Sequence, residues 1–438
     1  MSLIRKGLIA IVGTTGVGKS QLAIEIARAV NGEVINADAL QMYAGYDIIT
    51  NKVTPEETQG VAHHLLGNIP VHREYTVQEF ERDALAKIAE IHGRDHVPIL
   101  VGGTNYYVQS VMFGKSLVRQ EQIDPPDRGF ESRFAGTSNE DLWQELRAKD
   151  PIMAENWHPN NRRKVLRSLE VLHMTGRRHS EWVRETEDAR AHEETLRFPT
   201  LLLWLFADPA KLNARLDARV DTMMARGMFA EIEQLARDIA DPCALGGSAA
   251  DDFTVGLKQA IGFREFQPYL QAKAEGNPEP SELDALKAAG IVDMKTATRR
   301  YAKRQISWLR NKMLPECNTT LEKTLHAHAF VLDATDLDRW NADVRDPGTR
   351  LARSFIADEK LPDASSLSST AAAMLADIKA PNSVLAWRRH LCSVCSTDDK
   401  QVWLNGDDEH KQHMRSRRHR RNVQWQRKNK REVNKSEE

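Results

Sequence analysis

The sequence lacks the features that would mark a membrane protein or a disulfide-bonded secreted protein. No apolar run in the 438 residues approaches the ~18 that a membrane-spanning helix needs. The cysteines are few, and only the last two are close enough together to form a C-x-x-C pair: Cys243, Cys317, Cys392 and Cys395. This pattern excludes a disulfide framework and predicts a reducing compartment with one candidate metal site.

The chain also lacks an excess of charge of either sign. Its 61 Lys and Arg nearly balance its 62 Asp and Glu, so the net charge of −1 indicates no particular partner. The stretch 1–6 before the first apolar run is too short for a secretory signal. We expect a monomer of two or three domains in the cytoplasm, with mitochondrial and nuclear pools left open.

A phosphate-binding loop follows the first apolar run. Residues 13–20 fit the P-loop pattern G-x-x-x-x-G-K-[ST], and they are Gly13, Thr14, Thr15, Gly16, Val17, Gly18, Lys19 and Ser20. A predicted strand at 8–12 and a predicted helix at 21–30 flank the loop, as the motif requires, whereas a chance glycine turn would lack both. We expect the loop N–H groups and Lys19 to hold a polyphosphate, and Ser20 to hold Mg²⁺.

Further apolar runs alternate with helical patterns, which predicts an α/β fold with a P-loop NTPase-like parallel sheet. The expected strands are 33–37, 97–101 and 200–207, and the expected helices are 75–91, 211–235 and one through 298–310. From about 114 to 197 this rhythm is replaced by charged, helix-forming sequence. We therefore predict a core at 1–113 and 198–345, interrupted by a helical insertion at 114–197.

Two polar residues follow predicted strands, where ligands bind in parallel sheets. Asp38 comes after the strand at 33–37, and Thr104 follows the strand at 97–101 through two glycines. Asp38 is expected near the ligand of the P-loop, with a helix cap or loop turn as the alternative. Thr104 would donate a hydrogen bond into the site or cap a helix. Many ATP-hydrolysing P-loop proteins carry a carboxylate at the end of an apolar strand, where two glycines and Thr104 follow here, so a plain ATPase is disfavoured.

Basic residues recur at three places beyond the P-loop. Arg163, Lys164 and Arg167 share part of a predicted helix in the insertion, which suits phosphate contact or a solvated surface. Lys303 and Arg304 lie on the long helix near 298–310, which suits a diphosphate or nucleic-acid contact or a charged outer face. Residues 411–431 contain ten Lys or Arg and no acidic residue, typical of nucleic-acid binding or of a nuclear-import signal.

The C-terminal part reads as a linker followed by a zinc module. Residues 346–385 are predicted to be a linker because 358–381 are rich in Ser, Ala and Asp. Residues 386–431 contain the spacing C-x₂-C-x₁₇-H-x₅-H, formed by Cys392, Cys395, His413 and His419. Two thiolates and two imidazoles predict a closed, structural Zn²⁺ site, with His410 as a competing ligand. A tail without metal is the alternative.

Together these motifs resemble the tRNA dimethylallyltransferase (tRNA isopentenyltransferase) family. The resemblance runs to about Arg310 and rests on six stretches in the family's order: GTTGVGKS, DALQMY, PILVGGTNYY, HPNNRRKVLRSLEV, QAIGFREF and TRRYAKRQISWLR. The zinc module resembles an extension of the eukaryotic members. Ala39 departs from the pattern, because the family commonly has serine there, and this leaves any role of that hydroxyl open.

The resemblance implies transfer of a dimethylallyl group from dimethylallyl diphosphate to N6 of adenosine 37 in tRNA. It implies that residues 13–20 hold the diphosphate with Lys303, Arg304 and Mg²⁺, that Asp38 is the general base, and that Lys19 and Thr104 assist. The implied tRNA contacts are Asp38, Ala39, Leu40 and Gln41, and in the insertion Arg163, Lys164, Val165, Leu166 and Arg167.

Two other function classes stay open on the sequence alone. A P-loop small-molecule kinase would share the N-terminal half, but it would not explain the basic zinc tail. A non-catalytic RNA-binding zinc protein would not need the intact Lys19, Ser20 and Asp38. A kinase consumes ATP, a prenyltransferase ignores it, and a binding protein turns over neither substrate.

Overall fold

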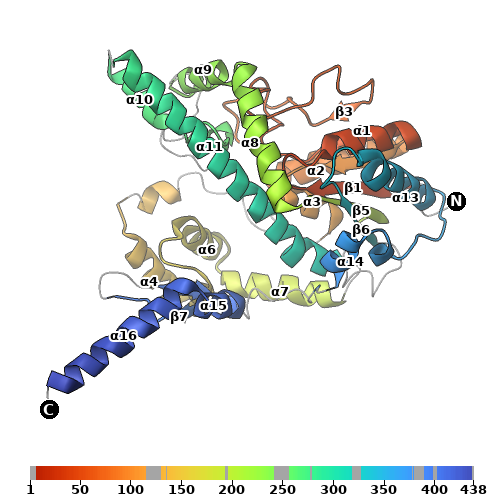
Figure 1. The fold of residues 1–438 in the computed structure, drawn as a ribbon. Coiled ribbons are helices and arrows are strands. Elements are labelled where there is room, and N and C mark those ends of the chain that lie inside the picture. Colours follow the sequence, from red (N-terminus) through yellow and green to blue (C-terminus); the bar gives the residue numbers. More distant parts are fainter. Residues whose placement is uncertain are drawn as a thin grey trace. The chain divides into compact units, whose positions relative to one another are not determined.

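The computed structural model describes residues 6–114, 130–134, 136–192, 196–240, 256–276, 279–317, 327–376, 378, 389–397 and 402–436. The chain divides into two compact units (Figure 1). Unit 1 comprises Met1–Ser116 and Glu194–Pro381, and unit 2 comprises Leu117–Glu193 and Asn382–Glu438. Cys243, expected to be an isolated cysteine, lies outside the described residues. No helix in the described residues is both long and apolar enough to cross a membrane.

Unit 1 is built on a parallel sheet of six strands in the order β3-β2-β4-β1-β5-β6. The strands are β1 Leu8–Gly13, β2 Gly32–Asn36, β3 His63–His64, β4 Val97–Val101, β5 Thr200–Phe206 and β6 Ala327–Asp333. The expected parallel sheet is confirmed, but β3 and β6 were not predicted. β3 has only two residues, and the apolar part of β6 is only 329–332, so neither gives a strong pattern.

Helices cover both faces of this sheet, because its side chains alternate in direction. Ile9 and Ile11 of β1 pack with α1 (Lys19–Val30) and α13 (Asp346–Ile356). Leu8 and Ala10 of the same strand pack with α2 (Val77–Gly93) and α3 (Asn105–Met112). The near-continuous apolar runs of the strands follow from this burial on both faces.

Four helices of unit 1 lie between β5 and β6 in the described sequence: α8 Pro209–Ala225, α9 Met228–Ala240, α10 Gln267–Glu275 and α11 Pro280–Trp308. A 3₁₀ turn, η4, spans Gly256–Gln259, and a π-helical turn, η5 (Leu309–Met313), continues α11. The helix expected over 211–235 is divided in two at Gly227, which has a φ of 95°. Glycine tolerates this left-handed conformation, so the chain ends α8 before Gly227 and begins α9 after it.

The linker predicted over 346–385 is wrong for most of its length. Residues 346–375 contain α13, η7 (Ala364–Ser366) and α14 (Ser369–Leu375), and all of them belong to unit 1. Leu351 and Phe355 of α13 are buried against α1, and Ala371 of α14 is fully buried. Two of the residues that suggested a linker are helix caps: Asp363 accepts a hydrogen bond from the N–H of Ser365 at 2.7 Å, and Ser368 accepts one from the N–H of Ala371 at 3.0 Å.

Unit 2 combines the insertion with the C-terminal module. Its described elements are η3 Glu131–Phe134, α4 Asn139–Lys149, α5 Pro151–Asn156, α6 Arg162–Thr175, α7 His179–His192, β7 Arg389–Leu391, β8 Trp403–Asn405, α15 Gly406–Met414 and α16 Arg417–Ser436. Arg389 joins the two parts, because its guanidinium donates to the carbonyls of Ala154 and Glu155 at 3.0 and 2.7 Å. It also lies over the rings of Trp143 and Trp403 at 5.4 and 5.1 Å. Sequence-distant segments therefore form one unit.

Candidate active site and metal centre

The strand order brings the predicted site residues of unit 1 to one edge of the sheet. β2, β4 and β1 are neighbours, and their carboxyl ends lead into Asp38, Thr104 and the P-loop, respectively. The ends approach closely, because a Cβ added to Gly102 would lie 2.1 Å from the carbonyl oxygen of Ala37. Only glycine fits there. A Cβ on Gly103 would lie 3.1 Å from Oδ2 of Asp38. This carboxylate therefore faces residues 102–104, the loop that follows β4 and that we call the β4 loop.

The P-loop presents the open N-terminus of α1. Gly18 is the N-cap residue with a φ of 90°, and no side chain caps the helix. The first N–H groups of α1 are therefore available to an anion, which the helix dipole also attracts. A Cβ on Gly18 would lie 2.6 Å from the ring of Trp340, so both the backbone angle and the packing require glycine. Trp340 was not predicted as a neighbour of the loop.

Lys19 lies within this loop and faces two other charged groups. Its Nζ donates a hydrogen bond to the carbonyl of Thr14 at 2.7 Å. Burial lowers the pKa of Lys19 to about 8, the carboxylate of Asp38 opposes this shift, and the guanidinium of Arg219 adds to it. The ammonium form still dominates at neutral pH, so the loop carries a full positive charge.

Arg219 is a site residue that the sequence did not reveal. It comes from α8, and its Nη1 donates to Oγ1 of Thr15 at 2.8 Å. Desolvation lowers its pKa, while Asp38 raises it. Two cations, Lys19 and Arg219, thus converge with one carboxylate at the phosphate loop. Nothing in the sequence around Arg219 distinguishes it from other arginines on the exposed faces of helices.

One carboxylate oxygen of Asp38 stabilises a backbone turn, and the other is available to a substrate. Its Oδ1 accepts the N–H of Leu40 at 3.2 Å, as in the loop turn considered as an alternative. The side chain of Asn36 holds the backbone on either side, because Oδ1 accepts from the Asp38 N–H and Nδ2 donates to the Asp38 carbonyl, both at 3.2 Å. Burial raises the pKa of Asp38, and Lys19 and the backbone donors work against that rise. Such a carboxylate is a stronger proton acceptor than a solvated one.

Thr104 occupies the N-cap position of α3 without capping it. Its side chain makes no capping bond, and instead Oγ1 accepts the N–H of Ala39 at 3.0 Å. The hydroxyl hydrogen then remains available for a donor role. Ala39 itself takes part through its backbone, so this bond does not depend on the serine that the family commonly has.

Gln305 of α11 joins the P-loop to the β4 loop. Its Oε1 accepts the N–H of Thr15 at 2.9 Å, and its Nε2 donates to the carbonyl of Gly103 at 2.8 Å. Tyr301, one turn earlier, donates to the same carbonyl at 3.3 Å. Gln305 is 4% exposed. One buried amide thereby fixes two loops that lie far apart in the sequence.

The predicted cations of α11 lie beside this contact. Lys303 and Arg304 are exposed, and the guanidinium of Arg304 lies 5.8 Å from the centre of the Tyr301 ring. The residues of α11 that bond the loops are Tyr301 and Gln305. A sequence signal existed, because Gln305 shares the helical spacing of the buried residues Thr298, Ala302 and Leu309. A polar residue on an apolar helix face is expected to have a specific partner.

The expected tRNA-binding loop after Asp38 is only partly available. Ala39, Leu40 and Gln41 are half-buried. The amide of Gln41 donates to the carbonyls of Thr50 and Asn51 at 3.2 and 3.0 Å, which fixes the loop that follows β2. Its Nε2 therefore has a structural role already.

Two of the five residues of α6 that were expected to contact tRNA have buried side chains. Val165 and Leu166 are 0% and 5% exposed and pack in the core of unit 2, because they lie on the inward face of the helix. Arg163 and Lys164 are exposed, and Nζ of Lys164 lies 4.2 Å from the centre of the Trp157 ring. Arg167 is half-buried and pairs with Glu170 at 2.7 Å.

The four predicted zinc ligands meet in unit 2. One ligand atom from each of Cys392, Cys395, His413 and His419 lies within 4.8 Å of the others. Nδ1 of His419 is 3.4 and 3.5 Å from the two sulfurs and 3.2 Å from Nε2 of His413. A tetrahedral zinc ion with ordinary bond lengths requires about 3.6 Å between S and N and about 3.3 Å between two N. The donor set and its geometry are therefore compatible with structural zinc.

His410 is not part of this cluster. Its ring stacks on that of His390 at 4.5 Å, one helical turn before His413. Asn422 of α16 is an unpredicted neighbour, because its Nδ2 donates to Sγ of Cys395 at 3.4 Å. Such a bond orients a ligand thiolate and stabilises its charge. The spacing of the sequence identified the ligands but not this supporting residue.

Comparisons with known proteins agree on one family. The family described as "IPP transferase" matches residues 41–312. The tRNA dimethylallyltransferase of Saccharomyces cerevisiae is 34% identical over 95% of this chain and 92% of its own. That of Homo sapiens is 35% identical, over 94% and 85%. A solved structure of a eukaryotic dimethylallyltransferase acting on tRNA covers 98% of this chain and 99% of its own, with a TM-score of 0.76 and 32% identity.

Proposed function

The chain belongs to the IPP transferase family, and we propose that it transfers a dimethylallyl group from dimethylallyl diphosphate to N6 of adenosine 37 in tRNA, forming N6-isopentenyladenosine. The observation that carries the proposal is the meeting of Asp38, Thr104 and the P-loop at one sheet edge, braced by Gln305. A proton acceptor beside an anion site is what this displacement needs. The kinase alternative is less favoured, because the relatives are named as transferases acting on tRNA.

The reaction forms a carbon–nitrogen bond, and it breaks a carbon–oxygen bond and an N–H bond. The lone pair of N6 attacks the first carbon of the dimethylallyl group, and the carbon–oxygen bond to the diphosphate breaks. The diphosphate leaves with that electron pair, and N6 loses a proton. We assign this proton to Asp38, whose burial raises its pKa above the usual carboxyl value. Thr104, with its hydroxyl hydrogen available, would orient the amine or the donor.

The P-loop would stabilise the leaving diphosphate. Negative charge grows on the diphosphate oxygens as the bond breaks, and preorganised N–H groups and cations lower the energy of that state. The N–H groups at the start of α1 and the ammonium of Lys19 supply this environment. Arg219, held on Thr15, would add a second cation at the same end. Lys303 and Arg304 remain proposed contacts of the outer diphosphate oxygens.

Ser20 fits the role of an Mg²⁺ ligand. It is the second residue of α1, is half-buried, and its hydroxyl has no hydrogen-bond partner among the described residues. Mg²⁺ prefers oxygen donors and takes few protein ligands when phosphates supply the others. Bound there, the ion would neutralise part of the diphosphate charge. A single protein hydroxyl is a weak site by itself, so we expect Mg²⁺ to bind together with the diphosphate.

Unit 2 would bind the tRNA. Arg163 and Lys164 are exposed on α6, and α16 carries a dense run of arginines and lysines from 417. These cations would contact the backbone of the anticodon stem-loop, and the target adenine would be flipped out of its stack to reach Asp38. The zinc site would fix α15 and α16. We propose that the protein acts as a monomer on cytoplasmic tRNA, with mitochondrial and nuclear tRNA as further substrates.

A turnover assay with labelled dimethylallyl diphosphate, Mg²⁺ and bulk tRNA, with and without ATP, tests the proposal. We expect label to enter tRNA at the same rate in both cases, and digestion to release N6-isopentenyladenosine. Lys19→Ala is the negative control for the diphosphate site. ATP-dependent phosphorylation of a small acceptor, without prenyl transfer, would restore the kinase alternative and overturn the proposal.

A further inference from the structure

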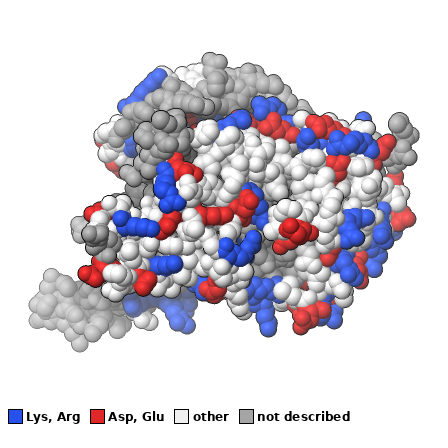
Figure 2. Space-filling model, turned by 90° about the horizontal axis from the view of Figure 1, so that it is seen from above, with Lys and Arg blue, Asp and Glu red and all other residues white. Residues whose placement is uncertain are grey.

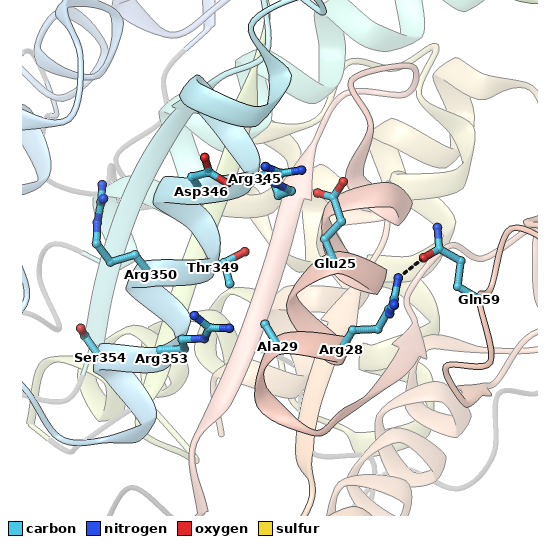
Figure 3. A pocket seen from close by; sticks show the side chains of 10 residues that line it. All are labelled: Glu25, Arg28, Ala29, Gln59, Arg345, Asp346, Thr349, Arg350, Arg353 and Ser354. Carbon is cyan, nitrogen blue, oxygen red and sulfur yellow. Dashed lines mark hydrogen bonds and ion pairs between the residues drawn. The ribbon is translucent and has the colours of Figure 1, made fainter.

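A pocket with an excess of positive charge lies in unit 1, between α1 and α13 (Figure 3). Its volume is about 890 Å³. Four arginines and two carboxylates line it: Arg28, Arg345, Arg350, Arg353, Glu25 and Asp346. None of the lining residues belongs to the P-loop or to the loops that carry Asp38 and Thr104. We call it the α1/α13 pocket, and the proposed function does not use it.

The walls of this pocket are two packed helices. Leu22 and Ile26 of α1 share a buried cluster with Leu351 and Phe355 of α13. A Cβ on Gly348 would lie 3.1 Å from the side chain of Leu22, which shows how closely the helices approach. The pocket is therefore the outer part of a rigid helix pair. Figure 2 shows Lys and Arg along the right-hand edge of that view, with Asp and Glu among them.

Both carboxylates of the pocket already have partners. Glu25 accepts hydrogen bonds from the indole N–H of Trp340, at 3.1 Å to each oxygen, and Asp346 pairs with Nε of Arg345 at 2.9 Å. These bonds hold the negative groups at one end of the pocket, where Figure 3 shows Glu25, Arg345 and Asp346 together. The charge of one of the four arginines, Arg345, is thereby neutralised by an ion pair.

The other three arginines have no acidic partner among the residues that the structure describes. Nη1 of Arg28 donates to the neutral amide of Gln59 at 2.5 Å. Arg350 and Arg353 lie about one turn apart on α13, and neither makes an ion pair with any residue that the structure describes. In Figure 3, Arg353 extends from α13 toward α1, whereas Arg28 extends from α1 toward Gln59. Positive charge therefore borders the pocket from both helices.

The chemistry of the lining selects among anions. The planar guanidinium fork matches phosphate oxygens in a bidentate geometry, and several forks favour a group with more than one phosphate. No aromatic side chain lines the pocket, so it offers no stacking surface for a nucleotide base. Its volume is in the range of small-molecule sites. We propose that the α1/α13 pocket is a second anion site, which binds a small, multiply phosphorylated ligand of the diphosphate class.

Equilibrium dialysis of the full-length protein with labelled inorganic diphosphate tests this. The wild type binds two equivalents, one at the P-loop and one in the pocket. Lys19→Ala keeps only the pocket site. In that background, Arg353→Glu weakens the remaining site at least tenfold, because it removes one charge-assisted contact and adds repulsion. Arg28→Glu has the same effect, although it lies on another helix.

Matched variants separate a built site from general electrostatics. Arg226→Glu makes the same charge change on an exposed arginine at the end of α8 and leaves both equivalents in place. Arg353→Lys keeps the charge but loses the fork, and it gives an intermediate affinity. All these side chains are exposed, so thermal melting is expected to show folded proteins.

Three results would overturn the proposal. In the first, the wild type binds a single equivalent that Lys19→Ala removes. In the second, Arg353→Glu and Arg226→Glu weaken diphosphate binding to the same extent. The same conclusion follows if sulfate, at equal ionic strength, displaces the labelled diphosphate from the pocket as effectively as unlabelled diphosphate does. In the third, Arg353→Glu weakens tRNA binding but leaves diphosphate stoichiometry unchanged, which would make this surface an RNA contact. Prenyl transfer itself can fail without affecting any of these readouts.

Discussion

The site at the sheet edge and the candidate metal centre of unit 2 are assembled in different ways. A tetrahedral zinc site needs four ligand atoms, and the four candidate ligands follow a recognisable spacing in the sequence, with Asn422 bonded to one of them. The sheet-edge site begins with a contiguous loop but is completed by Gln305 and Arg219 from distant helices. Ligand chemistry is visible in a sequence, whereas the residues that brace a site are visible only when the fold brings them together.

The largest effect is expected at Asp38, because it is the proposed base. Asp38→Asn keeps the size and the turn-forming oxygen but cannot accept the proton, so kcat falls by about 10²- to 10⁴-fold. Single-turnover kinetics with tRNA and dimethylallyl diphosphate measure it, and a filter-binding assay shows unchanged tRNA affinity. Asp284→Asn, on the exposed side of α11, is the control. If tRNA affinity falls in proportion to kcat, Asp38 is a tRNA-binding residue and not the general base.

At the metal centre, the supporting residue is the one to remove. Asn422→Leu deletes the donor to Cys395 and is expected to weaken zinc affinity about 10- to 100-fold, the range for orienting groups around metal ligands. Competition with a chromogenic chelator measures it. Gln424→Leu, an exposed neighbour on α16, leaves the affinity unchanged. Equal affinities in the two variants would mean that the spacing of the ligands alone specifies the centre.

Gln305→Leu tests whether the hydrogen bonds from α11 to the two loops of the sheet-edge site support catalysis. The substitution leaves the N–H of Thr15 without its acceptor and removes the shorter of the two hydrogen bonds to the carbonyl of Gly103, while filling a similar volume. We expect kcat/KM for dimethylallyl diphosphate to fall about tenfold, or ~1.4 kcal/mol. Gln234→Leu on the exposed face of α9 serves for comparison. An unaltered kcat/KM would show that the P-loop holds its geometry without α11.

The pH dependence gives the smallest effect. The pKa of Lys19, lowered by burial to about 8, means that the free enzyme loses the ammonium as the pH rises past that value. Since the protonated form binds the diphosphate, kcat/KM at pH 8.5 is expected to be about fourfold below that at pH 7. Lys19→Arg keeps its proton and moves the alkaline limb to higher pH. An alkaline limb that stays in place in Lys19→Arg would assign it to another group.

The sequence predicted the central strands because each is a short apolar run with a turn signal at its end. It missed β6, whose run is shorter, and it read 346–385 as a linker because capping residues such as Ser368 resemble linker composition. Val165 and Leu166 were carried over with a motif that mixes exposed and buried positions. A motif marks a stretch of chain, but helical periodicity decides which of its side chains face outward.

The sequence by itself determined the P-loop, the strand-end positions of Asp38 and Thr104, and the four candidate metal ligands. These features depend on local chemistry: a glycine turn, a strand end and the fixed spacing of thiolates and imidazoles. Only the tertiary structure decided that Gln305 joins Thr15 to Gly103, that Trp340 covers Gly18, and that arginines of α1 and α13 border one pocket. Such contacts join residues hundreds of positions apart, and packing selects them.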